Sequence, residues 1–165
     1  MSATGQGGLG LYIMQDLAAH PAVEDTEIIG YLVREAHRAY MRALQSRISA
    51  HGVSMGQWFF LCALWEEDGL TQRELSQRVG MMEPTTVTAL NGMERAGLVT
   101  RVRNSHDRRK VNIFLTDKGR ALRGTLEPYA KNLNQAALTG LSPGEAATAV
   151  SAIRRMAQNL IQAGI

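Results

Sequence analysis

The chain has 165 residues, of which 45% are hydrophobic and 20% are charged, which is typical of a folded protein with one buried core. No apolar stretch approaches the roughly 20 residues of a membrane span, and residues 1–10 lack a signal-peptide pattern, so we expect a cytoplasmic protein. Cys62 is the sole cysteine, which excludes an intramolecular disulfide and a cysteine-rich metal site.

The net charge of +3 is unevenly distributed along the chain. Residues 71–123 hold eleven basic and five acidic side chains, a balance of +6, whereas the remainder has a balance of −3. A local basic block favours a polyanionic partner, because neutralising phosphates releases their counterions. A solvated basic surface would give the same counts, so charge alone does not decide between them.

The first 25 residues are rich in glycine and indicate an N-terminal arm, within which residues 9–19 have the pattern of a short helix. Apolar residues then recur at helical spacing from Thr26 to about Ala50, and Gly52 is expected to end this helix. A second, largely buried helix is predicted to begin at Ser54, with Gln57 completing a capping box.

Two short helices follow, within Thr71–Gly80 and Glu83–Gly97. The first opens with a capping box through Glu74, and the second has proline at its first helical position. Val87, Leu90 and either Met93 or Glu94 mark successive turns along the expected inner face of the second short helix.

Residues 98–115 change to alternating periodicity, which predicts a hairpin whose polar loop spans Asn104–Lys110. A long helix is expected from Thr116 to Ala137, and a last helix starts at Ser142, which is followed by Pro143 and Glu145. We therefore expect a mainly α-helical fold with six main helices and a β wing of two or three strands. This is a winged helix-turn-helix combined with a helical dimerisation region.

Within this order, the second short helix is the candidate recognition helix for the major groove of DNA. It carries short hydrogen-bonding side chains, although threonines after a proline are also common at a helix start. These are Thr85, Thr86, Thr88 and Asn91. Backbone N–H groups at Thr71, Gln72 and Thr85 are available for phosphates.

The hairpin concentrates cations, and a cluster of arginines next to a helix-turn-helix suits the narrow, negative minor groove. The charged residues of the ribbon are Arg101, Arg103, Asp107, Arg108, Arg109 and Lys110. We interpret this ribbon as a DNA-binding wing.

Several motifs in this region resemble the MarR (multiple antibiotic resistance regulator) family of bacterial repressors. They are Gly52-Val53-Ser54 with Gln57-Trp58, Leu70–Leu75, Glu83–Thr88, Met93–Val99, Asp107-Arg108-Arg109 and Val111–Gly119. The resemblance covers roughly Thr26–Ile165. It departs from the family's pattern at Glu83, where the family often has aspartate, and at Asn104-Ser105-His106, where the wing often opens with Asp-Pro.

The resemblance implies a homodimer that binds a palindromic double-stranded DNA site and carries no catalytic residue, metal or cofactor. Residues 26–52 and 116–165 would form the dimerisation region, and residues 53–115 the DNA-binding lobe. Thr85, Thr86, Thr88 and Asn91 would face the major groove. Arg109 would enter the minor groove, oriented by Asp107.

The resemblance also implies a repressor released by a small aromatic or phenolic acid, or its thioester. The wall of the effector site would come from the first helices and combine aromatic and cationic residues. The candidates are His37, Arg38, Tyr40, Met41, His51, Trp58 and Phe59. Aromatic and methionine residues at helical spacing are also typical of plain core packing.

Alternative functions remain open at this point. An oxidant sensor of the same family would use Cys62, and a protein-interaction module of the same fold would have lost DNA binding. A metal sensor is disfavoured because His20, His37, His51 and His106 share no ligand spacing. An enzyme is a remote option, since no nucleophile elbow, catalytic carboxylate pair or phosphate loop is found.

Overall fold

The computed structural model describes residues 25–105 and 107–164, and the chain divides into two units, Met1–Tyr40 and Met41–Ile165. The predicted N-terminal arm and its short helix lie outside the described residues.

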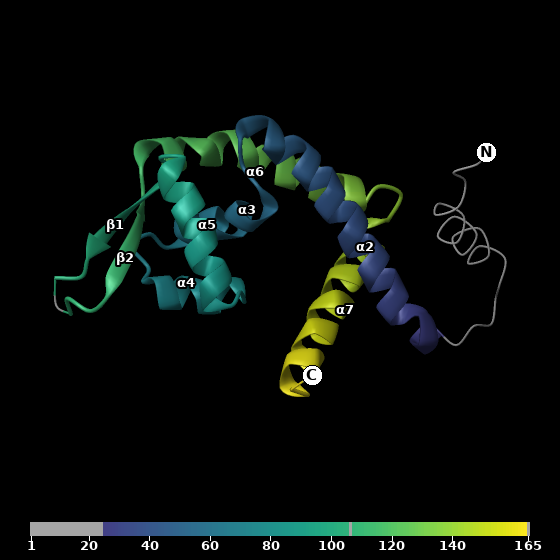
Figure 1. Ribbon diagram of the computed structural model, residues 1–165. Helices are drawn as coiled ribbons and strands as arrows, with labels where there is room; N and C mark the ends of the chain where they lie inside the picture. The colour runs from purple at the N-terminus through teal and green to yellow at the C-terminus, as the bar shows by residue number, and fades with distance from the viewer. Residues whose placement is uncertain (1–24, 106, 165) are drawn as a thin grey trace, which may run out of the picture. The chain divides into compact units, whose positions relative to one another are not determined.

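The elements follow one another in the predicted order (Figure 1). They are α2 (Asp25–Ile48), the 3-10 helix η1 (Ser49–His51), α3 (Met55–Glu66), α4 (Gln72–Val79), α5 (Glu83–Arg95), β1 (Val99–Arg103), β2 (Val111–Leu115), α6 (Asp117–Ala137) and α7 (Pro143–Gln162). Over the described ranges, six α-helices and one hairpin confirm the expected fold class. None of these helices is long and apolar enough to cross a membrane.

In the first unit, the described part of α2 presents large apolar side chains to solvent. These are Ile29, Leu32 and Val33. On the same helix the guanidinium of Arg34 lies 5.2 Å from the centre of the Tyr31 ring and forms an ion pair with Glu35 at 3.5 Å. This stretch of helix therefore shows an uncovered apolar face beside a charged one.

The second unit contains the hydrophobic core, to which the end of α2, helices α3 to α6 and the hairpin all contribute. Its fully buried side chains include Leu44, Ile48, Phe60, Leu61, Leu64, Leu75, Leu90, Met93, Ile113 and Leu126. By contrast, α7 has no buried residue, and Val150, Ile153, Leu160 and Ile161 are exposed on it.

Three helix starts have the capping boxes that the sequence predicts. Each serine or threonine side chain accepts a hydrogen bond from the backbone N–H three residues later, and the Gln or Glu at that position accepts one in return. The pairs are Ser54 with Gln57, Thr71 with Glu74, and Ser142 with Glu145.

The wing is an antiparallel pair in which Val99 faces Leu115 and Arg103 faces Val111. Strand β2 also bonds to the loop between α3 and α4, where the Ile113 N–H donates to the Leu70 carbonyl at 2.8 Å. An isolated bridge between Thr71 and Asn112 extends this contact. The sheet therefore has two strands, and the loop before α4 occupies the place of a third.

Asp68 connects the wing to the long helix. Its carboxylate accepts hydrogen bonds from the Leu115 N–H at 2.9 Å and from the Arg120 guanidinium at 2.5 Å. Arg120 in turn donates to the Leu115 carbonyl at 2.7 Å. Because these groups come from the α3–α4 loop, β2 and α6, the bonds hold the base of the wing against that loop and against α6.

Candidate nucleic-acid interface

The turn between α4 and α5 is fixed by local bonds. Gly80 adopts a left-handed φ of 69°, a conformation that favours glycine, and it closes α4 as predicted. The Ser76 hydroxyl donates to the Met81 carbonyl at 2.5 Å, and the Met81 N–H donates to the Ser76 carbonyl at 3.0 Å. Helices α4 and α5 contact each other directly, so they form the predicted helix-turn-helix.

The structure corrects the expected faces of α5. Thr86 is fully buried beside Leu90 and Met93, and its hydroxyl donates to the Met82 carbonyl at 3.2 Å. Val87, which the sequence places on the inner face, is 36% exposed. Thr86 therefore belongs to the core and cannot face a groove, because it takes the inward place predicted for Val87, while Leu90 is buried as predicted.

Asn91 and Arg101, both predicted to contact DNA, also contact each other. The Arg101 guanidinium donates to the Asn91 carboxamide oxygen at 2.7 Å and forms an ion pair with Glu94. The Arg101 side chain is only 24% exposed. This contact holds α5 against β1, a role for Glu94 that the sequence pattern does not indicate.

At the tip of the wing, Asp107 orients Arg109 as the resemblance implies. The carboxylate accepts from the Arg109 N–H and from Nε, both at 3.1 Å. The side-chain hydrogen bond from Arg109, with the backbone bond second, holds the pKa of Asp107 below its ordinary value. The Arg109 side chain remains 92% exposed, so its guanidinium projects from the tip.

Asn104 shapes the tip where the sequence departs from the family's usual pattern. Its carboxamide oxygen accepts from the Asp107 N–H at 2.9 Å, and its carboxamide nitrogen donates to Asn112 at 2.9 Å. An asparagine side chain that bonds its own backbone a few residues later replaces part of a turn.

The other predicted DNA contacts lie on the surface of the second unit. Thr85, Thr88, Arg103, Arg108 and Lys110 are exposed, while Thr71 and Gln72 are half-buried at the start of α4. The Thr71 hydroxyl also caps α4, and the bond from its backbone N–H is the main cause that lowers the pKa of Glu74.

A cleft of about 720 Å³ lies between the start of α4, the start of α5 and the wing. It is lined by Thr71, Gln72, Arg73, Glu74, Gln77, Glu83, Arg109, Lys110 and Val111. Three of these side chains are cationic and one wall is a helix N-terminus, a combination that suits a phosphate backbone. Arg73 and Gln77 were not predicted to contact DNA. Their positions on α4, close to Gln72, could have indicated such a contact.

The predicted effector residues fall into both units. His37, Arg38 and Tyr40 belong to the first unit, and Met41 to the second. In the second unit Trp58 is 7% exposed and packs edge-on against Trp65 at 5.7 Å between ring centres, so it is a core residue. Phe59 is half-buried. His51 is exposed, and its Nε2 lies 3.3 Å from the Tyr129 hydroxyl, within hydrogen-bonding distance.

A second cleft, of about 320 Å³, lies within the second unit between the end of α2 and α6. It is lined by Ala43, Leu44, Ser46, Arg47, Tyr129, Asn132, Leu133 and Ala136. This set could not be predicted from the sequence, because helical spacing does not show which residues of two distant helices meet. It combines an apolar floor with one cation, one phenol and one amide.

Cys62 has the properties of a packing residue. Burial, followed by the charges of Glu66 and Glu127, raises the pKa of the Cys62 thiol to about 12. A reactive cysteine needs a lowered pKa, because the thiolate is the nucleophile. Across the described ranges, no group of three His, Cys, Asp or Glu residues could hold a metal ion.

The region that contains this interface is similar to known transcriptional regulators. The family model described as MarR family matches residues 53–111, which include the helix-turn-helix and most of the wing. The regulator TtmR of Methylorubrum extorquens is 38% identical over 97 residues, which span 59% of this chain but only 50% of that protein. The homoprotocatechuate degradative operon repressor of Escherichia coli is 35% identical over 54% of this chain and 58% of its own length.

Solved structures extend the likeness over nearly the whole of the compared chains. The PcaV transcriptional regulator of Streptomyces coelicolor is 30% identical, with a TM-score of 0.69 over 81% of this chain and 97% of that one. Bordetella bronchiseptica BpsR, whose DNA binding is regulated by 6-hydroxynicotinic acid, is 26% identical, with a TM-score of 0.71 over 78% and 98% of the two chains.

Proposed function

Because the chain belongs to the MarR family of transcriptional regulators, we propose that it is a homodimeric repressor that binds a palindromic DNA site in the cytoplasm. The observation that carries this proposal is the contact between Arg101 and Asn91, which joins the wing to α5. With the two elements joined in this way, α5 can enter a major groove while Arg109 enters the adjacent minor groove. The relatives are named as regulators, which supports a protein without enzymatic activity.

The apolar faces of α2 and α7 support the dimer. Residues on both helices expose large aliphatic side chains, and such faces mark interaction sites in soluble proteins. We assign residues 26–52 and 116–165 to dimerisation and residues 53–115 to DNA binding. In the dimer, two α5 helices that enter successive major grooves would lie about 34–36 Å apart.

The repressor is proposed to respond to a small aromatic acid. Two relatives support this class of ligand: the repressor of the homoprotocatechuate degradative operon, and BpsR, which responds to 6-hydroxynicotinic acid. In this chain the cleft beside Arg47 and Tyr129 offers a cation for the carboxylate and a phenol for a second polar group. His51 joins this proposed site through its contact with Tyr129. For His37, Arg38, Tyr40, Met41 and Phe59, an effector role stays a prediction from the family resemblance.

DNA binding is tested by selection from a duplex library with a randomised core, followed by binding measurements on the enriched sequence. We expect an enriched inverted repeat, bound by a dimer whose mass is measured by light scattering. Arg109→Ala should weaken binding about tenfold or more, whereas Lys131→Ala, which removes the same charge from α6, should have little effect. An interaction module without DNA binding would enrich no sequence at all.

The effector site is tested by titrating homoprotocatechuate and 6-hydroxynicotinic acid, and the thioesters of such acids, into the protein–DNA complex. Ligand binding should release the DNA and change the fluorescence of Trp58 and Trp65. Arg47→Ala should abolish the response, and Arg42→Ala, on the same helix but outside the cleft, should keep it. If both variants respond like the wild type, the effector binds elsewhere.

A further inference from the structure

The first two turns of α5 expose aliphatic side chains beside the polar residues Glu83 and Thr85. Met82, just before the helix, is 77% exposed, and Val87 is 36% exposed. Pro84 is also exposed between them. A recognition helix that reads bases through hydrogen bonds would be expected to carry polar groups at these positions.

Two threonines of this segment, Thr86 and Thr88, use their hydroxyls within the helix. The Thr88 hydroxyl donates to the Pro84 carbonyl at 3.1 Å, the usual bond of a helical threonine to the carbonyl four residues earlier. The Thr86 hydroxyl does the same toward Met82 in the core. The donor of Thr88 is therefore occupied, and its methyl group remains as part of an exposed side chain.

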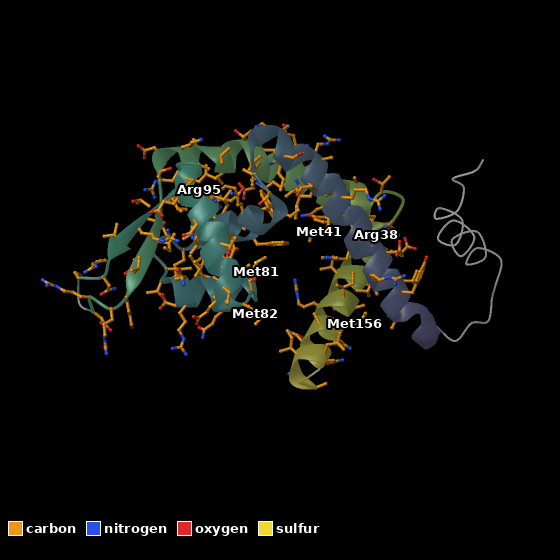
Figure 2. The ribbon with its side chains drawn as sticks, in the orientation of Figure 1. Arg38, Met41, Met81, Met82, Arg95 and Met156 are labelled. Atoms are coloured by element: carbon orange, nitrogen blue, oxygen red, sulfur yellow. The ribbon has the colours of Figure 1, made fainter. Side chains whose placement is uncertain are left out.

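Polar groups gather instead toward the other end of the helix. There the Arg101 guanidinium bonds to the Asn91 carboxamide, and Nε of Arg95 donates to the Asn91 carbonyl at 3.3 Å. Figure 2 shows Met82 and Arg95 at opposite ends of α5. The exposed aliphatic groups of the helix thus lie near its start, and the side chains bonded to the wing lie near its end.

The charges around this apolar face indicate what covers it. The cleft beside this face is lined by three cations, Arg73, Arg109 and Lys110, and two carboxylates, and this excess of positive charge favours a polyanion over an apolar protein. In the major groove of DNA, the one methyl group that any base exposes is the C5-methyl of thymine. The N-terminal residues of a recognition helix are those that contact base edges.

We propose that the start of α5 selects thymine by packing Met82, Val87 and the Thr88 methyl group against thymine C5-methyl groups. This inference rests on the proposed DNA binding and names the chemistry by which the sequence is read. It assigns specificity to two residues that sequence analysis did not select, and it removes the Thr88 hydroxyl from the set of base-reading groups.

The test replaces thymine by deoxyuridine in the enriched DNA site, one position at a time. This change deletes the C5-methyl group and leaves the base pair and its hydrogen-bonding groups intact. Binding of the full chain is measured by fluorescence anisotropy at one fixed salt concentration, since affinity depends on salt. At the thymines read by α5 we expect about fourfold weaker binding per methyl group, the value for burying one methylene-sized group.

Matched protein variants identify the side chains that contact these methyl groups. Thr88→Ser removes the methyl and keeps the hydroxyl, whereas Thr88→Val removes the hydroxyl and keeps a methyl. We expect Thr88→Ser to bind about fourfold more weakly than Thr88→Val, because only the valine variant keeps a methyl group. In Val87→Ala, the deoxyuridine change at the contacted position should lose its effect, which is the signature of coupled groups. Circular dichroism checks that each exposed-site variant is folded.

The outcomes separate this inference from the proposed function. An enriched site at which deoxyuridine is neutral at all positions overturns methyl reading and leaves the DNA-binding regulator in place. The same holds if Thr88→Val weakens binding and Thr88→Ser does not, because the hydroxyl would then be the reading group. Failure to enrich any sequence overturns the proposed function and the inference together.

Discussion

The Arg101 guanidinium of β1 donates a 2.7 Å hydrogen bond to the Asn91 carboxamide of α5. Arg101, which was predicted to contact DNA, thus makes hydrogen bonds within the protein, and its charge is paired with that of Glu94. Arg109, in contrast, projects from the wing tip with 92% of its side chain exposed. The two arginines should therefore behave differently in DNA binding, although the charge pattern of the ribbon does not distinguish them.

We predict that Arg109→Ala lowers the salt dependence of DNA binding and that Arg101→Ala does not. Each phosphate contact contributes about 0.9 to the slope of log affinity against log salt concentration. Loss of Arg109 should reduce the slope by roughly this amount. Loss of Arg101 should leave the slope unchanged while weakening sequence discrimination, because α5 loses its support. A slope reduced as much by Arg101→Ala as by Arg109→Ala would mean that Arg101 also neutralises phosphate.

Thr86 should matter for stability and not for DNA recognition. Its hydroxyl bonds the Met82 carbonyl, which also accepts the Thr86 N–H at 3.0 Å, so Thr86→Val leaves no buried carbonyl unpaired. We expect Thr86→Val to cost less than about 1 kcal/mol in unfolding free energy and to bind DNA like the wild type. Thr86→Ala, which opens a cavity, should cost about 1–2 kcal/mol. If Thr86→Val is stable but loses specific DNA binding, Thr86 contacts the groove and the burial argument is wrong.

The case of Thr86 shows which parts of the fold the sequence could predict. Helix starts at Ser54, Thr71 and Ser142 were predicted correctly, because a capping box depends on residues three positions apart. On α5, Leu90 was predicted correctly, but the first inward position was assigned to Val87 instead of Thr86. Threonine and valine have nearly the same shape, so only packing against neighbouring elements decides which of two adjacent residues is buried.

The contacts that position the wing were beyond sequence reasoning for a related reason. Asp68 bonds Leu115 and Arg120, which follow it by 47 and 52 residues. A charged residue after a helix predicts only a turn, and no local pattern indicates a partner so far along the chain. The Asp107–Arg109 pair was predictable because its members are two residues apart and match a family motif.

Gly119 is required by the close approach of α6 to the wing. A Cβ added there would lie 2.2 Å from the Leu98 carbonyl oxygen and 3.0 Å from a methyl carbon of Leu115. We expect Gly119→Ala to destabilise the protein by about 1–3 kcal/mol, the usual cost of overpacking. Gly124 on the same helix has no atom within 4 Å of its added Cβ, so Gly124→Ala should stabilise by up to about 1 kcal/mol. Urea unfolding of both variants measures the difference, and equal effects would contradict this packing.

The capping box of α4 predicts a pH dependence. The bonds from Thr71 lower the folded pKa of Glu74 below its ordinary value of 4.5. A lowered folded pKa means that the ionised carboxylate stabilises the fold at pH values above 4.5 and that this contribution is lost as the pH falls through the folded pKa. The stability difference between the wild type and Glu74→Gln should therefore shrink on acidification below 4.5. A difference that stays constant would show that the charge of Glu74 plays no part in the cap.

The reactivity of Cys62 distinguishes a ligand-responsive repressor from an oxidant sensor. With a thiol pKa of about 12, the fraction of thiolate at neutral pH is very small, so native Cys62 should react with iodoacetamide far more slowly than in urea. Cys62→Ser should bind the DNA site like the wild type, and hydroperoxide should release DNA from neither protein. The serine variant is a fair comparison because its hydroxyl is close in size to the thiol. Rapid alkylation of the folded protein, together with release by hydroperoxide that Cys62→Ser abolishes, would establish redox sensing and displace the aromatic acid as the signal.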